Sequence, residues 1–127
     1  MILGLGVDAV DIARVNQLLE RHRDRVVARL FTPAEATYAC SRPDPVRHYA
    51  ARLAAKEAAY KALAGNDLAR AIGWREIEVV PRADGSPVLM LHGRAAQRAA
   101  EIGAAQVWVS LTHSDSSAVA VVIVEAR

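Results

Sequence analysis

Cysteine is nearly absent from this chain, since Cys40 is the only one in 127 residues. A lone cysteine cannot form an internal disulfide, so no oxidative cross-link stabilises the fold. This composition is typical of a reducing compartment, and we expect a cytoplasmic protein. The first residues carry no basic segment and an acid already occurs at position 8, so the N-terminus does not resemble a secretory signal.

Aromatic residues, excess charge and long apolar runs are also scarce. Aromatic residues make up 5% of the chain, so we do not expect aromatic stacking to drive ligand binding. A net charge of +2 is small for a protein that follows a nucleic-acid backbone, which usually concentrates more positive charge on one face. The longest C-terminal apolar run has the length of a strand and ends at Glu125. We therefore expect neither nucleic acid nor a membrane as a partner.

The length suits one domain, and we expect residues 1–127 to form it. Residues 2–8 have the pattern of a short buried strand, which would place Asp8 where the strand ends. Apolar residues then recur with a helical period over residues 11–30, with Asp11 as a candidate N-cap.

Two more helices are predicted in the first half of the chain. One begins at Thr32, because Thr32, Pro33 and Glu35 have the sequence of a capping box with proline at the first helical position. The prolines of "SRPDP" end it. The other is a long alanine-rich helix over residues 46–64, closed by the glycine and asparagine that follow.

The second half alternates short strands with one helix. Strand patterns occur over residues 74–81 and 88–92, and a helix broken at Gly103 follows them. Two further strands, 105–113 and 117–125, are joined by a polar turn. The whole pattern predicts an α+β fold in which an antiparallel sheet packs with the long central helix.

The lysines are confined to one short stretch. Lys56 and Lys61 both lie in "RLAAKEAAYKAL", while fourteen arginines supply every other positive side chain. Glu57 and Lys61 are four residues apart and share one face of the predicted helix. In the structural interpretation they form a surface pair that adds ~0.2–0.5 kcal/mol to the helix. A functional interpretation requires partners elsewhere in the chain.

Polar side chains that could supply such partners interrupt apolar elements at three places. The clusters are Asp8 with Asp11 and Arg14; Arg52, Lys56, Glu57 and Lys61; and "SLTHS", residues 110–114. Carboxylates without a cysteine or histidine pair at ligand spacing favour a hard cation, so Mg²⁺ is expected rather than zinc. Mg²⁺ uses one or two protein carboxylates and takes its other oxygens from water and phosphate, and the nearby cations could hold that phosphate.

Each candidate also has a structural interpretation. Asp8 or Asp11 could cap the first helix, and Arg14 could be a solvated helix residue. His113 at a strand end could be a structural histidine. His22, His48 and His92 have no partners at ligand spacing, so no role is assigned to them.

The first predicted helix carries a basic stripe. Arg14, Arg21 and Arg25 are spaced by seven and four residues, and Leu18 lies between them on the same face. Such a stripe could bind an acidic helix of a partner protein. It could equally be a solvated helix face.

Taken in order, the clusters resemble the holo-acyl-carrier-protein synthases, the small 4'-phosphopantetheinyl transferases. "GLGVDAVDIAR" resembles the first signature of that family, "FTPAE" the second and "ARLAAKEAAYKAL" the third. "DGSPVLMLHGRA" and "VSLTHS" resemble the C-terminal pair, so the likeness runs from Gly4 to about Val124. Leu53 departs from the phenylalanine usual in the family, and "KALAG" replaces the more usual KALG.

The resemblance implies a 4'-phosphopantetheinyl transferase-like fold and a reaction that supports fatty acid or polyketide biosynthesis. The 4'-phosphopantetheine of coenzyme A would move to a serine of apo acyl carrier protein and release 3',5'-ADP. The resemblance also implies Mg²⁺, with Asp8 and Glu57 as its carboxylate ligands. Glu57 could take the serine proton directly or through a metal-bound water.

Further roles are implied by position. Lys61 would stabilise charge on the diphosphate leaving group, as a second catalytic residue beside Glu57. Lys56 points about 100° away from Glu57 on the helix, so it would meet either a coenzyme A phosphate or solvent. Coenzyme A would also meet Arg52, His113 and Ser114. The carrier protein would meet the basic stripe, which consists of Arg14, Leu18, Arg21 and Arg25.

The family is usually a homotrimer with active sites between subunits, so the resemblance implies a homotrimer, and the apolar C-terminal strands would suit such an interface. Two other functions stay open: a small Mg²⁺-dependent phosphohydrolase that uses Asp8 and Glu57, and a non-catalytic module that binds an acidic protein through the basic stripe. The sequence does not identify the carrier protein, the tolerance for acylated coenzyme A, or whether Mn²⁺ can replace Mg²⁺.

Overall fold

The structure, a computed structural model, describes residues 1–127 and has the predicted α+β class. In chain order the elements are β1 (Ile2–Asp11), α1 (Ile12–Leu30), α2 (Pro33–Cys40), α3 (Pro45–Ala62), α4 (Asp67–Arg70), the 3-10 helix η1 (Trp74–Glu76), β2 (Ile77–Pro81), β3 (Pro87–Leu91), α5 (Gly93–Glu101), β4 (Gln106–His113) and β5 (Ser117–Glu125). No helix combines the length and the apolar character needed to cross a bilayer.

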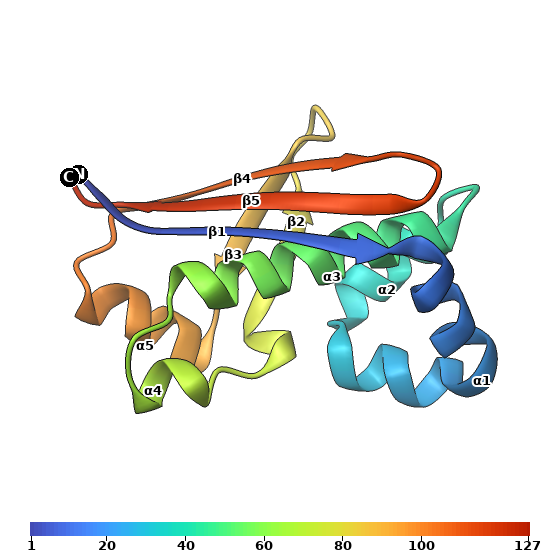
Figure 1. The fold of residues 1–127 in the computed structure, drawn as a ribbon, viewed down its shortest axis with the longest axis horizontal. Helices are drawn as coiled ribbons and strands as arrows, with labels where there is room; N and C mark the ends of the chain where they lie inside the picture. Colours follow the sequence, from blue (N-terminus) through green and yellow to red (C-terminus); the bar gives the residue numbers. More distant parts are fainter.

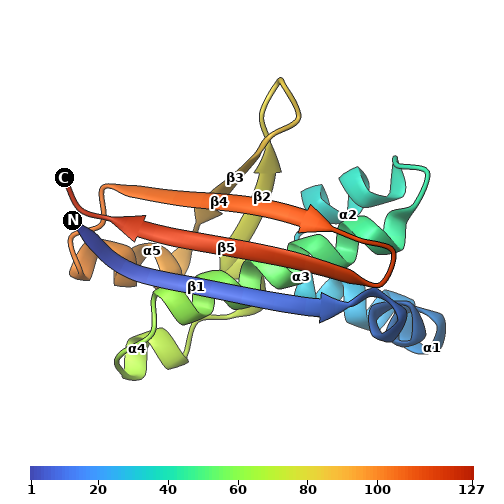
Figure 2. The same cartoon turned by 45° about the horizontal axis from the view of Figure 1, so that its top comes forward.

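Three strands form the main sheet, in the order β1-β5-β4, and β2 with β3 forms a separate hairpin. All pairings are antiparallel, as predicted. Helix α3 runs along one face of the main sheet, with α1 and α2 near one end and α4 and α5 near the other (Figure 1). The two chain ends lie side by side (Figure 2), where the amide of Ala126 donates to the carbonyl of Met1 at 2.8 Å.

Helix α3 is the centre of the core. Its alanines lie all around its circumference, and most of them are buried between the sheet, the hairpin and the other helices. A helix that is apolar on every side is expected to be buried, and small side chains let its neighbours approach closely. Every polar side chain on α3 therefore needs a partner in a packed interior or an opening to solvent.

Two glycines set the distance between β1 and α3. A Cβ on Gly4 would overlap the carbonyl oxygen of Ala62, and one on Gly6 would overlap that of Ala58. The clashing atoms are backbone, so they cannot move aside without displacing the strand from the helix. These glycines thus allow the close packing that brings Asp8, two residues further along β1, onto the flank of α3.

The outer face of the main sheet is apolar and uncovered in this chain. Leu5 pairs with Ile123 and Val7 with Val121, so these side chains share one face, which Trp108 of β4 joins through Ile123. Leu5 is 63% exposed, Val7 55% and Trp108 49%. A contiguous apolar surface of this kind is typical of a protein interface.

The helix starts follow the predicted caps. The side chain of Asp11 accepts a hydrogen bond from the amide of Ala13, which confirms it as the N-cap of α1. The reciprocal capping box of Thr32 and Glu35 is also present. One helix was not predicted: α4 begins at Asn66, whose side chain caps it, so Asn66 starts an element as well as following α3.

Two strand predictions need correction. Strand β1 is neither short nor buried, because its pairing with β5 continues to Asp11 and alternate side chains face outward. Asp8 therefore lies inside the strand rather than at its end. The segment 74–76 forms η1 instead of strand, because the side chain of Glu76 accepts the amide of Gly73 and closes a turn there.

Candidate functional site

Asp8, Glu57 and Lys61 meet where β1 crosses the C-terminal half of α3. The amino group of Lys61 donates to Asp8 Oδ1 at 2.8 Å and to the carbonyl of Val7 at 3.1 Å. Glu57 lies one helical turn before Lys61 on the same face, close enough to Asp8 for each carboxyl to affect the pKa of the other. The structure thus brings together the three residues that the sequence placed at the centre of the chemistry.

The two carboxyls of this cluster titrate differently. Burial and the neighbouring Asp8 carboxylate raise the pKa of Glu57 to about 7, against the opposing pull of Lys61 and Arg14. Burial alone would raise the pKa of Asp8, but the adjacent Glu57 carboxyl and the hydrogen bond and charge of Lys61 bring it below its ordinary value. Asp8 is therefore the anion of the pair, and Glu57 can exchange a proton near neutral pH.

One oxygen of this cluster has no partner. Asp8 Oδ2 is buried and accepts no hydrogen bond, although Oδ1 is bound to Lys61. No place in the structure gathers three or more His, Cys, Asp or Glu side chains that could hold a metal ion. The donor set of two carboxylates with an unused oxygen fits a hard cation that takes its remaining oxygens from water or phosphate.

Two pockets open beside Glu57. The first has a volume of about 380 Å³ and lies between the end of α3 and the segment that leads into β2. Its lining comprises Lys56, Glu57, Tyr60, Lys61, Arg70, Ile72, Gly73, Trp74 and Ile77. We call it the lysine pocket.

The second pocket, about 350 Å³, lies between α1 and α3, and we call it the α1 pocket. It is lined mainly by apolar side chains and has Arg14 and Leu18 of the basic stripe at its edge. Arg14 is near enough to Glu57 for its charge to lower the pKa of that carboxyl. One end of the stripe therefore lies at the candidate site.

The rest of the stripe continues along α1 with one interruption. Arg14, Leu18, Arg21 and Arg25 are all exposed, and Leu18 is the apolar member at 39%. His22 has non-helical backbone angles that kink α1 between Arg21 and Arg25. Regular helical spacing thus holds from Arg14 to Arg21, and the prediction of one continuous helical face is wrong at Arg25.

Arg52 lies away from the carboxylate cluster. It is 4% exposed, its guanidinium stacks 4.2 Å from the ring centroid of Tyr38, and its Nε is buried without a hydrogen-bond partner. Burial lowers its pKa, while Tyr38 and the charge of Glu35 act in the opposite direction. A buried guanidinium with an unused N–H is suited to binding an anion.

His113 and Ser114 lie at the end of β4 and in the turn that follows, and both are exposed. Ser114 Oγ accepts the amides of Ser116 and Ser117, so it also holds the turn. Burial lowers the pKa of His48 near the start of α3, and the nearby Arg52, Arg42 and His113 add to this effect. His113 therefore lies on the Arg52 half of α3, not beside Lys61.

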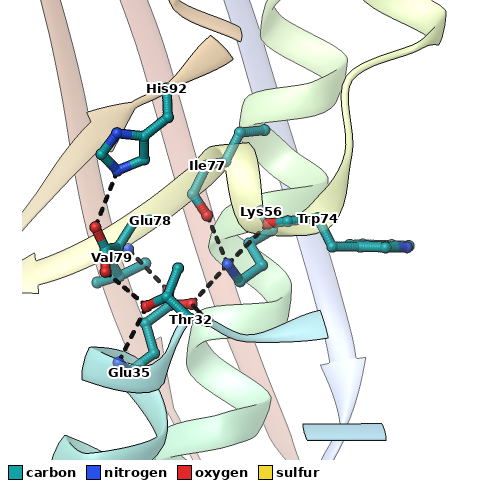
Figure 3. A network of polar contacts seen from close by, with 8 residues as sticks. All are labelled: Thr32, Glu35, Lys56, Trp74, Ile77, Glu78, Val79 and His92. Atoms are coloured by element: carbon teal, nitrogen blue, oxygen red, sulfur yellow. Dashed lines mark hydrogen bonds and ion pairs between the residues drawn. The ribbon is translucent and has the colours of Figure 1, made fainter. Parts of the chain in front are cut away.

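Lys56 corrects the sequence interpretation. Its side chain is fully buried, so it meets neither solvent nor a free phosphate. The amino group binds Glu35 Oε1 at 2.8 Å and donates to the carbonyls of Trp74 at 2.9 Å and Ile77 at 2.5 Å (Figure 3). Burial lowers the pKa of Lys56, and Glu35 opposes that effect.

The other end of this ion pair is equally well satisfied. Glu35 accepts the amide of Thr32 through Oε1 and the amide of Val79 through Oε2, each at 2.9 Å. Thr32 Oγ1 in turn donates to Glu78 at 2.6 Å, and Glu78 binds His92. The network joins α2, α3, η1 and the β2–β3 hairpin (Figure 3).

Sequence reasoning therefore missed the Glu35–Lys56 pair and the place of Trp74. One signal was available: a lysine surrounded by alanines on a helix that is apolar on every side must be buried, and a buried lysine requires an acid. Glu35 was identified only as a capping residue. Nothing in the local sequence of Trp74 indicated that it lines both pockets at Glu57.

Comparison with known proteins agrees with this geometry. The family described as the 4'-phosphopantetheinyl transferase superfamily matches residues 4–122. A holo-[acyl-carrier-protein] synthase of Anaeromyxobacter dehalogenans is 46% identical over 128 residues, covering 98% of this chain and 97% of that protein.

Solved structures show the same fold. The crystal structure of the synthase from Neisseria meningitidis has a TM-score of 0.86 at 28% identity and covers 98% of this chain and 99% of its own. The Bacillus anthracis synthase in complex with CoA (3',5'-ADP) has a TM-score of 0.80 at 29% identity, covering 100% of this chain and 99% of its own. The full-length match in sequence and in fold means that the chain belongs to the 4'-phosphopantetheinyl transferase superfamily, among the holo-[acyl-carrier-protein] synthases.

Proposed function

We propose that this protein transfers 4'-phosphopantetheine from coenzyme A to a serine of an apo acyl carrier protein and releases 3',5'-ADP. The observation that carries the proposal is the convergence of Asp8, Glu57 and Lys61 beside two pockets. Family membership supports the reaction, and a related synthase was crystallised with coenzyme A. Phosphoryl transfer needs positioned charge more than covalent help from the protein, and this cluster supplies such charge.

Mg²⁺ is the cofactor that fits this donor set. Asp8 and Glu57 would hold it, since Asp8 Oδ2 is buried without a donor and Glu57 lies beside it. When bound, Mg²⁺ would neutralise charge on the diphosphate. Lys61, half exposed and bound to Asp8, can turn its amino group toward a phosphate oxygen and stabilise the leaving group.

The serine proton needs an acceptor on the side from which the carrier approaches. Glu57 is the only acid that lines both pockets, so it faces both a phosphate near Lys61 and a serine entering past Arg14. Without metal its pKa is about 7, and a bound Mg²⁺ would favour the carboxylate form. The position of Glu57 at both pockets supports it as the base.

Arg52, His113 and Ser114 would bind the nucleotide part of coenzyme A, and their separation from Lys61 supports a shared site. On α3, Arg52 is about 13 Å before Lys61 and points about 140° away from Glu57. A homotrimer in which one subunit supplies the carboxylate cluster and its neighbour supplies Arg52 would unite them. The apolar outer face of Leu5, Val7 and Trp108 supports such an assembly.

The carrier protein would bind the basic stripe. Its exposed arginines suit an acidic helix, and the α1 pocket beside Leu18 offers an apolar recess next to Glu57. Arg21→Glu should raise the KM for the carrier about tenfold and leave the affinity for coenzyme A unchanged. Arg29→Glu, an exposed arginine of α1 outside the stripe, is the matched control. Equal effects of the two variants would contradict the assignment.

Intact mass spectrometry tests the reaction. An apo acyl carrier protein is incubated with coenzyme A, Mg²⁺ and the protein, and the expected result is a mass increase of one phosphopantetheine. Glu57→Gln and a chelator-treated sample should give no increase. Release of inorganic phosphate without carrier modification would favour a phosphohydrolase, and no turnover with any carrier would favour a binding module. We also propose that the protein acts in the cytoplasm, where coenzyme A and carrier proteins occur.

A further inference from the structure

Helix α5 lies near the C-terminal end of α3, the helix whose last turn carries Lys61 (Figure 1). One side chain joins the two. Arg98 of α5 donates through Nε to the carbonyl of Leu63 at 2.8 Å and through Nη2 to the carbonyl of Ala64 at 3.1 Å. The side chain of Arg98 is only 12% exposed and lines neither pocket, so it does not face a ligand bound in either of them.

The two carbonyls that Arg98 binds belong to the residues that follow α3. The last carbonyls of a helix lack partners within it and carry the partial negative charge of the helix dipole. A cation that donates to the chain at this end therefore stabilises the last turn. The amide of Ala64 donates to the carbonyl of Lys61 at 3.3 Å, so the turn that Arg98 holds is joined directly to the backbone of Lys61.

The guanidinium of Arg98 is itself held in place. Its Nη1 donates to Glu101 Oε1 at 2.7 Å, and Asn66 Nδ2 donates to the same oxygen at 2.6 Å. Gly65 leaves room for the guanidinium, since a Cβ on this residue would lie 2.8 Å from Arg98 Nη2. The turn between α3 and α4 is thus built around Arg98.

Lys61 depends on this turn more than the other members of the carboxylate cluster do. Asp8 lies inside a strand that is paired with β5, and Glu57 lies one turn further from the end of the helix. Helix ends fray before helix centres, so a loosened turn would displace Lys61 before Glu57. We infer that Arg98 is a positioning residue for the transfer reaction, which holds the end of α3 so that the amino group of Lys61 meets the diphosphate.

This inference rests on the proposed function, in which Lys61 stabilises the leaving group. A residue that acts through Lys61 should change kcat rather than the KM for the carrier protein. A misplacement of about 1 Å in a catalytic group can cost about 100-fold in rate. Lys61 keeps its partner Asp8 when Arg98 is removed, so we expect a smaller loss in kcat, about tenfold for Arg98→Met.

A double-mutant cycle on kcat for carrier modification tests this role. Arg98→Met should lower kcat about tenfold in native protein and by less than about twofold in Lys61→Met, because the residue through which it acts is then gone. The matched control is Arg94→Met, which removes an α5 arginine that pairs with Glu76 instead of binding the end of α3. Its kcat should be native.

Two results of the cycle would overturn the inference. An equal loss in both backgrounds would mean that Arg98 acts independently of Lys61, as a residue with a merely structural role would. No loss in either background would mean that Arg98 does not position Lys61. Arg98→Lys keeps the charge but not the planar pair of donors, so it should lose about threefold in native protein. It replaces Arg98→Met in the cycle if that variant does not fold.

Amide hydrogen exchange gives a readout that does not depend on the reaction. The amides of Leu63 and Ala64 donate to the carbonyls of Ala59 and Lys61, so in Arg98→Met they should exchange about tenfold faster than in native protein. Amides in the middle of α3 should keep their native exchange. Unchanged exchange at Leu63 and Ala64 would contradict the inference. Native protein that modifies no carrier would contradict the proposed function, whatever the exchange shows.

Discussion

Helix α3 carries two lysine–carboxylate pairs of the same length in two different environments. Lys56 meets Glu35 at 2.8 Å with both side chains fully buried, and Lys61 meets Asp8 at 2.8 Å with Lys61 54% exposed. Every polar atom of the buried pair has a partner within the chain, whereas Asp8 keeps a buried oxygen without one. Two pairs of identical chemistry thus differ in what they leave free for a ligand.

The difference assigns a role to each lysine. A buried lysine cannot leave its carboxylate partner without a desolvation cost, so Lys56 acts as a structural residue, an internal tie that joins α3 to Glu35 and to the carbonyls of Trp74 and Ile77. A lysine at the surface can leave its partner for a phosphate at little cost, because an exposed pair is weak. The following predictions test this division, from the largest expected effect to the smallest.

Lys56→Met should lower the free energy of unfolding by about 3–5 kcal/mol, because it leaves Glu35 as an uncompensated buried charge. Urea denaturation measures the change. Glu35→Gln in the Lys56→Met background should recover part of the loss, since the unpaired charge is gone. If Lys56→Met cost less than about 1 kcal/mol, or the second change recovered nothing, the pair would not be the tie described here.

Lys61→Met should reduce kcat for carrier modification about 100- to 1000-fold, the usual effect of removing one donor to developing charge. Its thermal midpoint should stay at the native value, because the side chain is exposed and its pairing is weak. Arg82→Met, at another exposed cation on the hairpin, serves as a control for loss of surface charge. A stability loss like that of Lys56→Met would remove the contrast between the two lysines.

Gly6→Ala should destabilise the protein by about 1–3 kcal/mol and also reduce transfer, because the new Cβ pushes β1 away from the backbone of α3 and carries Asp8 with it. Gly85→Ala is the comparison, since a Cβ there meets no atom and only the positive φ of the turn is strained. Gly85→Ala should leave transfer at the native rate. Unimpaired transfer by Gly6→Ala would contradict the role of close packing in building the site.

In the absence of metal, the stability of Glu57→Gln relative to native protein should increase as pH rises. The pKa of Glu57 is about 7 in the folded state, so between pH 4.5 and 7 the folded protein binds more protons than the unfolded chain, and stability falls as pH rises through this window. The variant lacks this loss, so its advantage over native protein should grow to about 1 kcal/mol by pH 8. Thermal melts of both proteins at pH 5 and pH 8 measure it, and a constant difference would contradict the shifted pKa.

Local signals in the sequence predicted much of the fold. The caps at Asp11 and Thr32 were predictable because they depend on residues within one turn of the chain. The pairing of the last two strands was predictable from their alternation and the short turn between them. The turn at Trp74 is held by a tertiary contact, the hydrogen bond from Lys56, and neither it nor the kink at His22 had a signal in the local sequence.

The residues of the candidate site also divide into those that local sequence predicted and those that depend on the folded chain. Glu57 and Lys61 were predicted together because four residues on a helix fix their relation, and Asp8 joined them through the motif resemblance. The burial of Lys56 had a signal in the alanines around it, but its partner could not be predicted, because Glu35 lies on another helix and sequence does not say which side of α3 that helix covers. Nine residues on one helix already place Arg52 about 13 Å from Lys61 and on another face, but sequence could not show that Arg52 is buried against Tyr38.

The most direct test of this account follows the mass of an apo acyl carrier protein with native protein, Lys61→Met and Lys56→Arg side by side, at a temperature where all three are folded. The account predicts a gain of one phosphopantetheine with native protein and almost none with Lys61→Met over the same time. It predicts that Lys56→Arg, which keeps a cation opposite Glu35, retains transfer. Two results would contradict this account: transfer at the native rate by Lys61→Met, or a folded Lys56→Arg that is as inactive as Lys61→Met. Either result would mean that α3 does not carry one structural lysine and one phosphate-binding lysine.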